Sequence, residues 1–187
     1  LQNMSGANTI LLAVILGMMI AFDMGGPVNK VAFSFMILSV SEQIYTIPAM
    51  IGVAICVPPI GLGISTLIAP KKYSDEEKET GKAAILMGLV GVTEGAIPFA
   101  AANPLRVIPA LMAGAACGSV TAGLLGAKLS SSWGGLIVLP TVENKIGYII
   151  AVLVGASVTA VLAAALKKSE VKESVSDSDD IELEIEF

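Results

Sequence analysis

The 187-residue sequence is 55% hydrophobic and 14% charged, and it contains 19 glycines but no histidine. Soluble domains carry roughly a quarter charged residues. This composition, with a mean hydropathy of +0.81, therefore excludes an ordinary soluble domain and predicts an all-α polytopic membrane protein. The lack of histidine argues against zinc, haem and Ser-His or Cys-His catalysis, so we expect no metal, no cofactor and no catalytic residue on this chain.

The formal net charge of −5 is concentrated at the C-terminal end of the sequence. Residues 169–187 contain eight acidic side chains and one lysine, whereas residues 1–168 carry a net charge of +2. This division predicts a membrane domain over residues 1–168 and an acidic tail over residues 169–187. The serine-containing, charged tail is typical of a disordered cytoplasmic segment, with a partner-docking segment as the alternative.

Two apolar runs at the start of the chain, residues 9–22 and 31–40, are shorter than the ~20 residues needed to cross a bilayer. The glycines and proline between them open a helix rather than extend it, and Asp23, Asn29 and Lys30 place polar groups there. The pair predicts a broken helix or re-entrant hairpin at membrane depth, where protein or water must cover the open backbone.

Residues 47–69 form an uncharged run that is long enough to span, with kinks expected at Pro58 and Pro59. The lysines of the following link, residues 71–82, indicate a cytoplasmic loop. Ser74 and Glu77, three residues apart, resemble a capping box and predict a short surface helix.

The second half of the sequence alternates short and long apolar runs. Residues 107–127 and 146–166 are long enough to span, while residues 83–92 and 136–142 are too short. If the 71–82 loop and the lysines after residue 166 lie on the same side, two full crossings separate them, and the short runs are re-entrant. The Gly114–Gly118 pair predicts close packing of its helix on a neighbour.

The interrupted stretch 91–109 holds Glu94 between apolar segments. It repeats the order of the first break: an acid, a glycine, a proline, an asparagine and a base. Short, Gly/Pro-interrupted segments in comparable positions point to a transporter's binding site. Glu94 is a candidate ligand-binding residue, because a carboxylate in apolar sequence is costly without a polar partner. A carboxylate accepts paired hydrogen bonds in a geometry that matches neighbouring hydroxyls, which suits a sugar.

A structural role is the alternative for these polar residues. Glu94 would then pair with Arg106, and Asp23 with Lys30, to neutralise charge. We also expect Cys56 and Cys117 to be small buried hydrophobic residues.

The stretches VTEGAIPFAAANPLRVIPALMAG and AFDMGGPVNKVAFSF resemble the two hallmark stretches of the fructose-type enzyme IIC membrane component (permease) of the bacterial phosphoenolpyruvate:sugar phosphotransferase system. The resemblance covers about residues 5–166 and implies that this chain is the C-terminal half of such a permease. It implies a multi-pass protein of the cell inner membrane. It also implies that an N-terminal IIC half completes the permease and that the complete permease is a homodimer. The implied partners are a sugar, the IIB and IIA components and the lipid bilayer, with no nucleic acid.

The resemblance also implies roles for individual residues. Glu94 occupies the position of a sugar-binding glutamate, with Thr93 and Gly95 beside it. The family pattern has an aspartate where Asn103 stands and Pro-His-Gly-Gly where Ser132-Trp133-Gly134-Gly135 stands, so the preferred sugar can differ from fructose. Trp133 is either a stacking face for the sugar or an interfacial anchor. The predicted substrate-binding residues are Glu94, Thr93, Gly95, Pro98, Asn103, Arg106, Asp23, Asn29 and Lys30.

As part of a protein-phosphohistidine/phosphocysteine:sugar phosphotransferase complex, the chain would move fructose or a fructose-like sugar while its IIB partner phosphorylates it. We expect no phosphoryl-carrying residue on the chain itself. Three alternatives stay open: an ion-coupled secondary transporter in which Glu94 or Asp23 binds a cation, a permease of the mannosylglycerate type, and a structural fragment that binds no sugar.

Overall fold

The computed structural model describes residues 6–167, so the predicted acidic tail lies outside the described residues. Over this range the chain is almost entirely helical, as predicted. The α-helices are α1 (Gly6–Asp23), α2 (Pro27–Ser41), α3 (Thr46–Ile68), α4 (Asp75–Val90), α5 (Ile97–Ala102), α6 (Pro104–Leu124) and α7 (Lys145–Leu166). The short elements are the 3-10 turns η1 (Pro70–Lys72), η2 (Thr93–Ala96) and η3 (Leu136–Thr141) and the antiparallel strands β1 (Lys128–Leu129) and β2 (Val142–Glu143).

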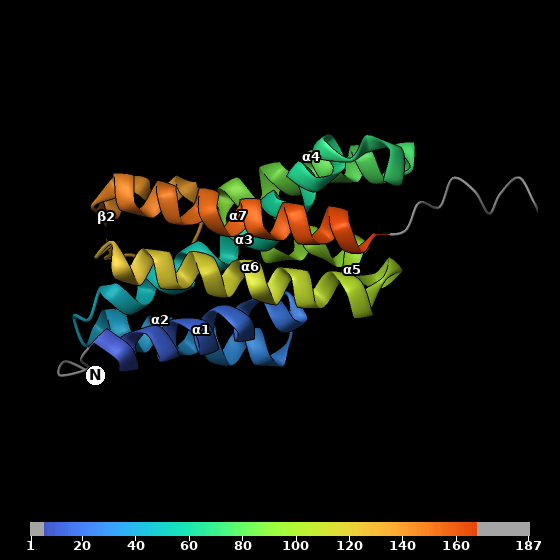
Figure 1. The fold of residues 1–187 in the computed structure, drawn as a ribbon. Helices are drawn as coiled ribbons and strands as arrows, with labels where there is room; N and C mark the ends of the chain where they lie inside the picture. The colour runs from blue at the N-terminus through green and yellow to red at the C-terminus, as the bar shows by residue number, and fades with distance from the viewer. Residues whose placement is uncertain (1–5, 168–187) are drawn as a thin grey trace, which may run out of the picture.

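Helices α3, α6 and α7 are long and apolar enough to cross a membrane, in agreement with the three predicted spans. Helix α3 forms the centre of the bundle and contacts α1, α4, α6 and α7 (Figure 1). Its spanning window is 83% buried inside the chain, whereas those of α6 and α7 are 44% and 39% buried. The outer faces of α6 and α7 therefore leave large apolar side chains exposed, as expected for contact with lipid or further protein.

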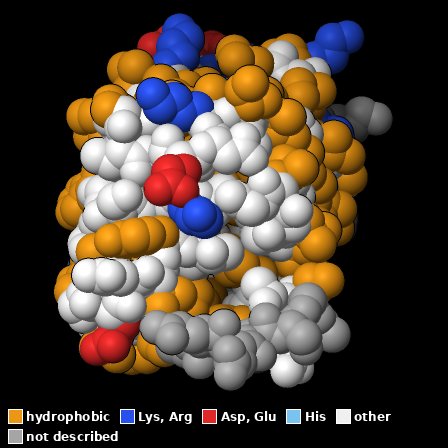
Figure 2. Space-filling view, turned by 90° about the vertical axis from the view of Figure 1, so that its left-hand side faces the viewer, with side chains coloured by type: hydrophobic (Ala, Val, Ile, Leu, Met, Phe, Trp, Pro, Cys, Tyr) orange, Lys and Arg blue, Asp and Glu red, His pale blue; other side chains and the backbone are white. Residues whose placement is uncertain are grey.

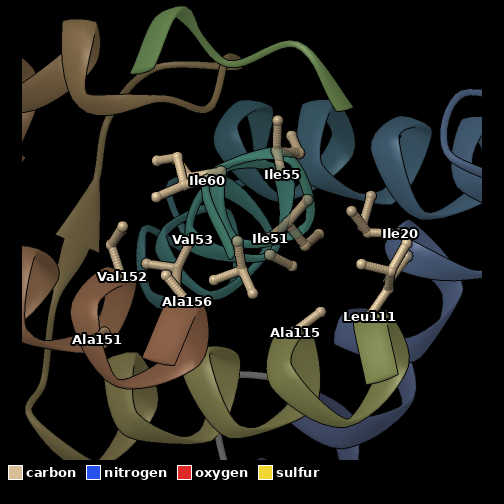
Figure 3. Close-up of a cluster of buried hydrophobic side chains, with 14 of the residues drawn as sticks. Ile20, Ile51, Val53, Ile55, Ile60, Leu111, Ala115, Ala151, Val152 and Ala156 are labelled. Atoms are coloured by element: carbon tan, nitrogen blue, oxygen red, sulfur yellow. The ribbon is translucent and has the colours of Figure 1, made fainter. Parts of the chain in front are cut away.

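The hydrophobic core lies around α3 (Figure 3). In this view the α3 side chains Ile51 and Val53 lie on the side of that helix that faces Leu111 and Ala115 of α6 and Ala156 of α7. Small residues from α6 and α7 allow these helices to approach α3 closely.

The predicted packing of the glycine pair is confirmed. Gly114 faces Thr159 and Gly155 of α7, so that a Cβ at this position would collide with the Thr159 hydroxyl oxygen. A Cβ at Gly118 would lie 3.0 Å from a Val53 methyl group. Cys56 is buried as expected, but the prediction for Cys117 is wrong: it is exposed on α6.

The bundle has two distinguishable ends. The strand end, at the left of Figure 1, contains β1, β2 and the start of α3, where the backbone N–H of Leu129 donates to the Tyr45 carbonyl oxygen at 2.9 Å. Viewed from this end, charged groups lie in the middle of the face and also at its upper and lower-left edges, and hydrophobic side chains line its flanks (Figure 2). At the opposite, lysine end, the Lys72 Nζ donates to the Ala164 carbonyl oxygen at 2.6 Å, and Lys167 pairs with Glu77. The 71–82 loop and the end of α7 thus share one side, which confirms the assumption behind the crossing count.

The region after the Ser74 cap differs from the prediction. Ser74 and Glu77 do form a capping box, but the helix does not stop at the surface: α4 continues without a break from Asp75 to Val90. The interior glycine, Gly81, is tolerated because it packs against Thr66 of α3, leaving no room for a side chain. The predicted surface helix and the predicted run 83–92 are therefore one helix.

Candidate functional site

Helix α4 ends at Gly91, where the chain reverses. Gly91 has φ +91°, and its N–H donates to the Gly88 carbonyl oxygen at 3.1 Å while that of Val92 donates to Met87 at 2.9 Å. A positive φ is most often found at glycine, because glycine has no Cβ to collide with the backbone. The chain then returns towards the lysine end through η2 and α5, with Gly95 packed against Ala84 and Met87.

A second reversal approaches Gly91 from the strand end. The loop after β1 places Gly134 against the Gly52 carbonyl oxygen and Ile55 of α3, about two turns inside that helix. The main chains of Gly91 and Gly134–Gly135 are in direct contact: a Cβ added to Gly135, whose φ is +98°, would lie 2.7 Å from the Gly91 nitrogen. The indole N–H of Trp133 donates to the Val90 carbonyl oxygen at 2.9 Å, which gives the last carbonyl of α4 a partner.

The turn between α1 and α2 is the third chain reversal in this region. The Asp23 carboxylate accepts hydrogen bonds from the backbone N–H groups of Val28 at 2.7 Å and Asn29 at 2.9 Å, which caps the start of α2. The Asn29 amide donates to the Ile20 carbonyl oxygen at 2.7 Å. Asp23 and Asn29 therefore hold this turn in shape. Gly25 then approaches Glu94 so closely that an added Cβ would lie 2.7 Å from Glu94 Oε1.

These three reversals enclose a pocket of about 190 Å³ beside Glu94. One water needs roughly 10–15 Å³ by such a measure, so the pocket has room for several waters or a small polar solute. The Glu94 side chain is exposed and accepts a hydrogen bond from the Thr93 hydroxyl at 3.3 Å. The side chains that line the pocket include Asn29, Lys30, Phe33, Thr93, Glu94 and Trp133.

The structure does not bring all the predicted site residues together. Asn103 and Arg106 line a different cavity at the lysine end, of about 20 Å³, which has room for about one water but not for a sugar. They lie there because α5 carries the chain away from Glu94. Pro98 is exposed in the first turn of α5, where proline favours helix initiation, and Gly95 faces α4. Within residues 6–167, neither Glu94–Arg106 nor Asp23–Lys30 is among the ion pairs.

Two parts of the site were not found from the sequence. Phe33 of α2 contacts Trp133 edge-on, with ring centroids 6.1 Å apart and an interplanar angle of 85°. Gly25 and Gly134 make the close approaches that shape the pocket. The Gly-Gly dipeptides at 25–26 and 134–135 were the available signal, since adjacent glycines mark places where backbones meet.

Residues 1–114 match the family model described as "Phosphotransferase system, EIIC". The chain belongs to this family. The EIIC chain is 58% identical over 190 aligned residues to "Fructose-like permease IIC component 2" of Escherichia coli K12, covering 100% of the chain and 53% of that protein. It is 44% identical to the "PTS system fructose-specific EIIC component" of Haloferax volcanii, covering 96% of the chain and 48% of the relative.

The names of longer relatives include components other than EIIC. The EIIC chain is 42% identical to the "PTS system fructose-specific EIIB'BC component" of Escherichia coli K12, covering 91% of the chain and 31% of the relative. It is 39% identical to the "PTS system fructose-specific EIIABC component" of Bacillus subtilis, covering 90% of the chain and 26% of the relative. The chain spans about half the length of the first two relatives. No solved structure matches it significantly.

Proposed function

We propose that this chain is the sugar-binding and translocating half of a phosphotransferase-system permease for fructose or a fructose-like sugar. The observation that carries the proposal is the convergence of three chain reversals on the Glu94 carboxylate, beside a pocket and without a cation paired to it in residues 6–167. The names of the relatives, which specify fructose or fructose-like sugars, support the substrate class.

The chemistry of the pocket fits a polyhydroxylated ligand. Glu94 supplies acceptor oxygens, the Lys30 ammonium supplies donors, and the Thr93 hydroxyl, which donates its own proton to Glu94, supplies acceptor lone pairs around the same space. Sugar hydroxyls both donate and accept, so they can satisfy all three groups. A single metal ion or a purely apolar ligand would leave part of this set without a partner.

The reversals at Gly91 and Gly134 enter the bundle from opposite ends, and we assign them to re-entrant hairpins. Open backbone is tolerated at membrane depth where it is covered by protein or lines a polar cavity. Each tip here covers the other, and both border the Glu94 pocket. Paired interrupted segments of this kind are typical of transporter binding sites.

The lysine end belongs on the cytoplasmic side of the inner membrane, because Lys71, Lys72, Lys78 and Lys167 gather there. On this assignment the acidic tail is cytoplasmic too. The fused EIIB'BC and EIIABC relatives support IIB and IIA as partners. The sugar would be phosphorylated by IIB on arrival at this side. The working permease would contain an N-terminal IIC half and assemble as a homodimer.

Uptake of labelled fructose by vesicles that contain the complete permease tests the proposal, with and without phosphorylated IIB. Glu94→Gln keeps the size of the side chain but removes its charge, and a hydrogen bond to a charged group contributes about 1.5–3 kcal/mol. We therefore expect fructose affinity to fall about 10- to 100-fold. Glu42→Gln, an exposed residue at the end of α2, is the matched control.

Unchanged uptake by the Glu94→Gln variant would reject the site. Gradient-driven uptake that needs no phosphorylated IIB would instead favour an ion-coupled transporter.

A further inference from the structure

We propose that Trp133 provides the apolar face on which the sugar ring stacks, and that it helps to determine which sugars fit. The inference rests on the proposed function of the Glu94 pocket. Trp133 lines this pocket together with Glu94 and is 47% exposed, so part of its ring faces open space. Phe33 supports it edge-on and completes an aromatic wall.

The hydrogen bond of the indole decides what Trp133 can offer a ligand. An indole has a single donor and no acceptor, and this donor is already bonded to the Val90 carbonyl oxygen at 2.9 Å. The ring is thereby fixed in place, and only its apolar surface remains available. Trp133 therefore contributes surface contact rather than a hydrogen bond.

The arrangement around Trp133 matches the two-sided chemistry of a monosaccharide. A sugar ring has a face of C–H groups and a rim of hydroxyls. The pocket offers an aromatic wall from Phe33 and Trp133, and charged groups from Glu94 and Lys30. Binding sites commonly combine aromatic walls with a few placed polar groups that fix orientation.

The position of Trp133 disfavours the alternative of an interfacial anchor. Anchoring tryptophans lie at the membrane–water boundary, at the ends of spanning helices. Gly134, the next residue, contacts Gly52 and Ile55, which are roughly 10 Å inside α3 from its first residue at 1.5 Å per residue. The indole itself bonds to Val90 at the internal end of α4. It thus lies at the joint between the two reversals.

The experiment compares Trp133→Ala and Trp133→Phe in the complete permease, with phosphorylated IIB and labelled fructose. Phenylalanine keeps an aromatic face but loses the bond to Val90, whereas alanine loses both. We expect Trp133→Ala to raise KM for fructose about tenfold with kcat within about twofold. Trp133→Phe should stay within about threefold of the original KM. Leu105→Ala, an exposed residue outside the pocket, is the control.

A direct readout separates stacking from a structural role. Trp133 is the only tryptophan of this sequence, so fructose binding should change the component of tryptophan emission that is lost in Trp133→Phe. Equal loss of affinity in both variants, or no change in either, would overturn the inference. Loss of binding in Glu94→Gln with normal binding in Trp133→Ala would overturn this inference alone. Normal binding in Glu94→Gln would instead reject the proposed function on which the inference rests.

Discussion

Gly25→Ala tests how the first chain reversal positions the Glu94 carboxylate. An added Cβ would lie 2.7 Å from Oε1 and 3.1 Å from the carboxyl carbon of Glu94, well inside normal contact distance. Because the clashing atoms are the free end of a side chain, the carboxylate will move rather than the backbone. A displacement of about 1 Å takes the carboxylate out of hydrogen-bonding distance of a bound sugar, and a hydrogen bond to a charged group contributes about 1.5–3 kcal/mol. We expect fructose affinity to fall at least tenfold.

The same substitution also strains the backbone, because Gly25 has φ +114°. A sparsely populated conformation costs about 1–3 kcal/mol in a residue with a Cβ. Gly126→Ala separates the two effects, since Gly126 also has a positive φ, +64°, but no heavy atom would lie within 4 Å of its Cβ. Both variants should lose thermal stability in detergent, and Gly25→Ala should lose more, because φ +64° lies in the left-handed α region that other residues can adopt whereas φ +114° does not.

Binding of labelled fructose to the purified complete permease supplies the deciding comparison. Only Gly25→Ala should bind fructose more weakly, while Gly126→Ala should bind it normally. If both variants bind alike, the contact between Gly25 and Glu94 does not position the carboxylate, and the reasoning from this turn fails.

Three further predictions concern stability of the complete permease in detergent. Asp23→Ala removes the carboxylate that caps α2 and should cost about 0.5–2 kcal/mol in a thermal unfolding assay. Glu42→Ala is the control, because Glu42 caps the other end of α2 through its backbone N–H, which the substitution keeps. Thr159→Val replaces a buried hydroxyl that has no hydrogen-bond partner within residues 6–167, and it should leave stability unchanged or raise it by about 1 kcal/mol; a clear loss would reveal a missed partner. Burial raises the pKa of Tyr73, although its hydrogen bond with Ser65 lowers it in part. The contribution of this shift to stability is complete below pH 10, the ordinary pKa of tyrosine, and is lost as the pH rises through the higher pKa of Tyr73 in the folded protein. The loss of stability over this pH range should be smaller in Tyr73→Phe.

The parts of the fold that follow local patterns could be predicted from the sequence. The three long helices are uncharged runs of sufficient length, and the start of α4 is encoded by Ser74 and Glu77. The length of α4 was missed because the change from charged to apolar residues at position 83 looked like a boundary. The helix continues because α3 covers its apolar face.

The composition of the site depended on contacts that no local pattern encodes. Asn103 and Arg106 follow Glu94 closely in the sequence, yet the short α5 carries them to another cavity. Gly25 and Trp133 are distant in the sequence and still reach the Glu94 pocket or its wall. Sequence spacing identified the charged residue at the centre, whereas the surrounding wall required the tertiary arrangement.

The bond between Val90 and Trp133 has a consequence for biogenesis. Its donor lies 43 residues after its acceptor, so α4 emerges from the ribosome with its last carbonyl unpartnered and acquires the indole only after α6 and β1 have been made. The Glu94 pocket is therefore a late product of assembly. A nascent chain halted before residue 133 would contain the acidic residue but not the enclosure around it.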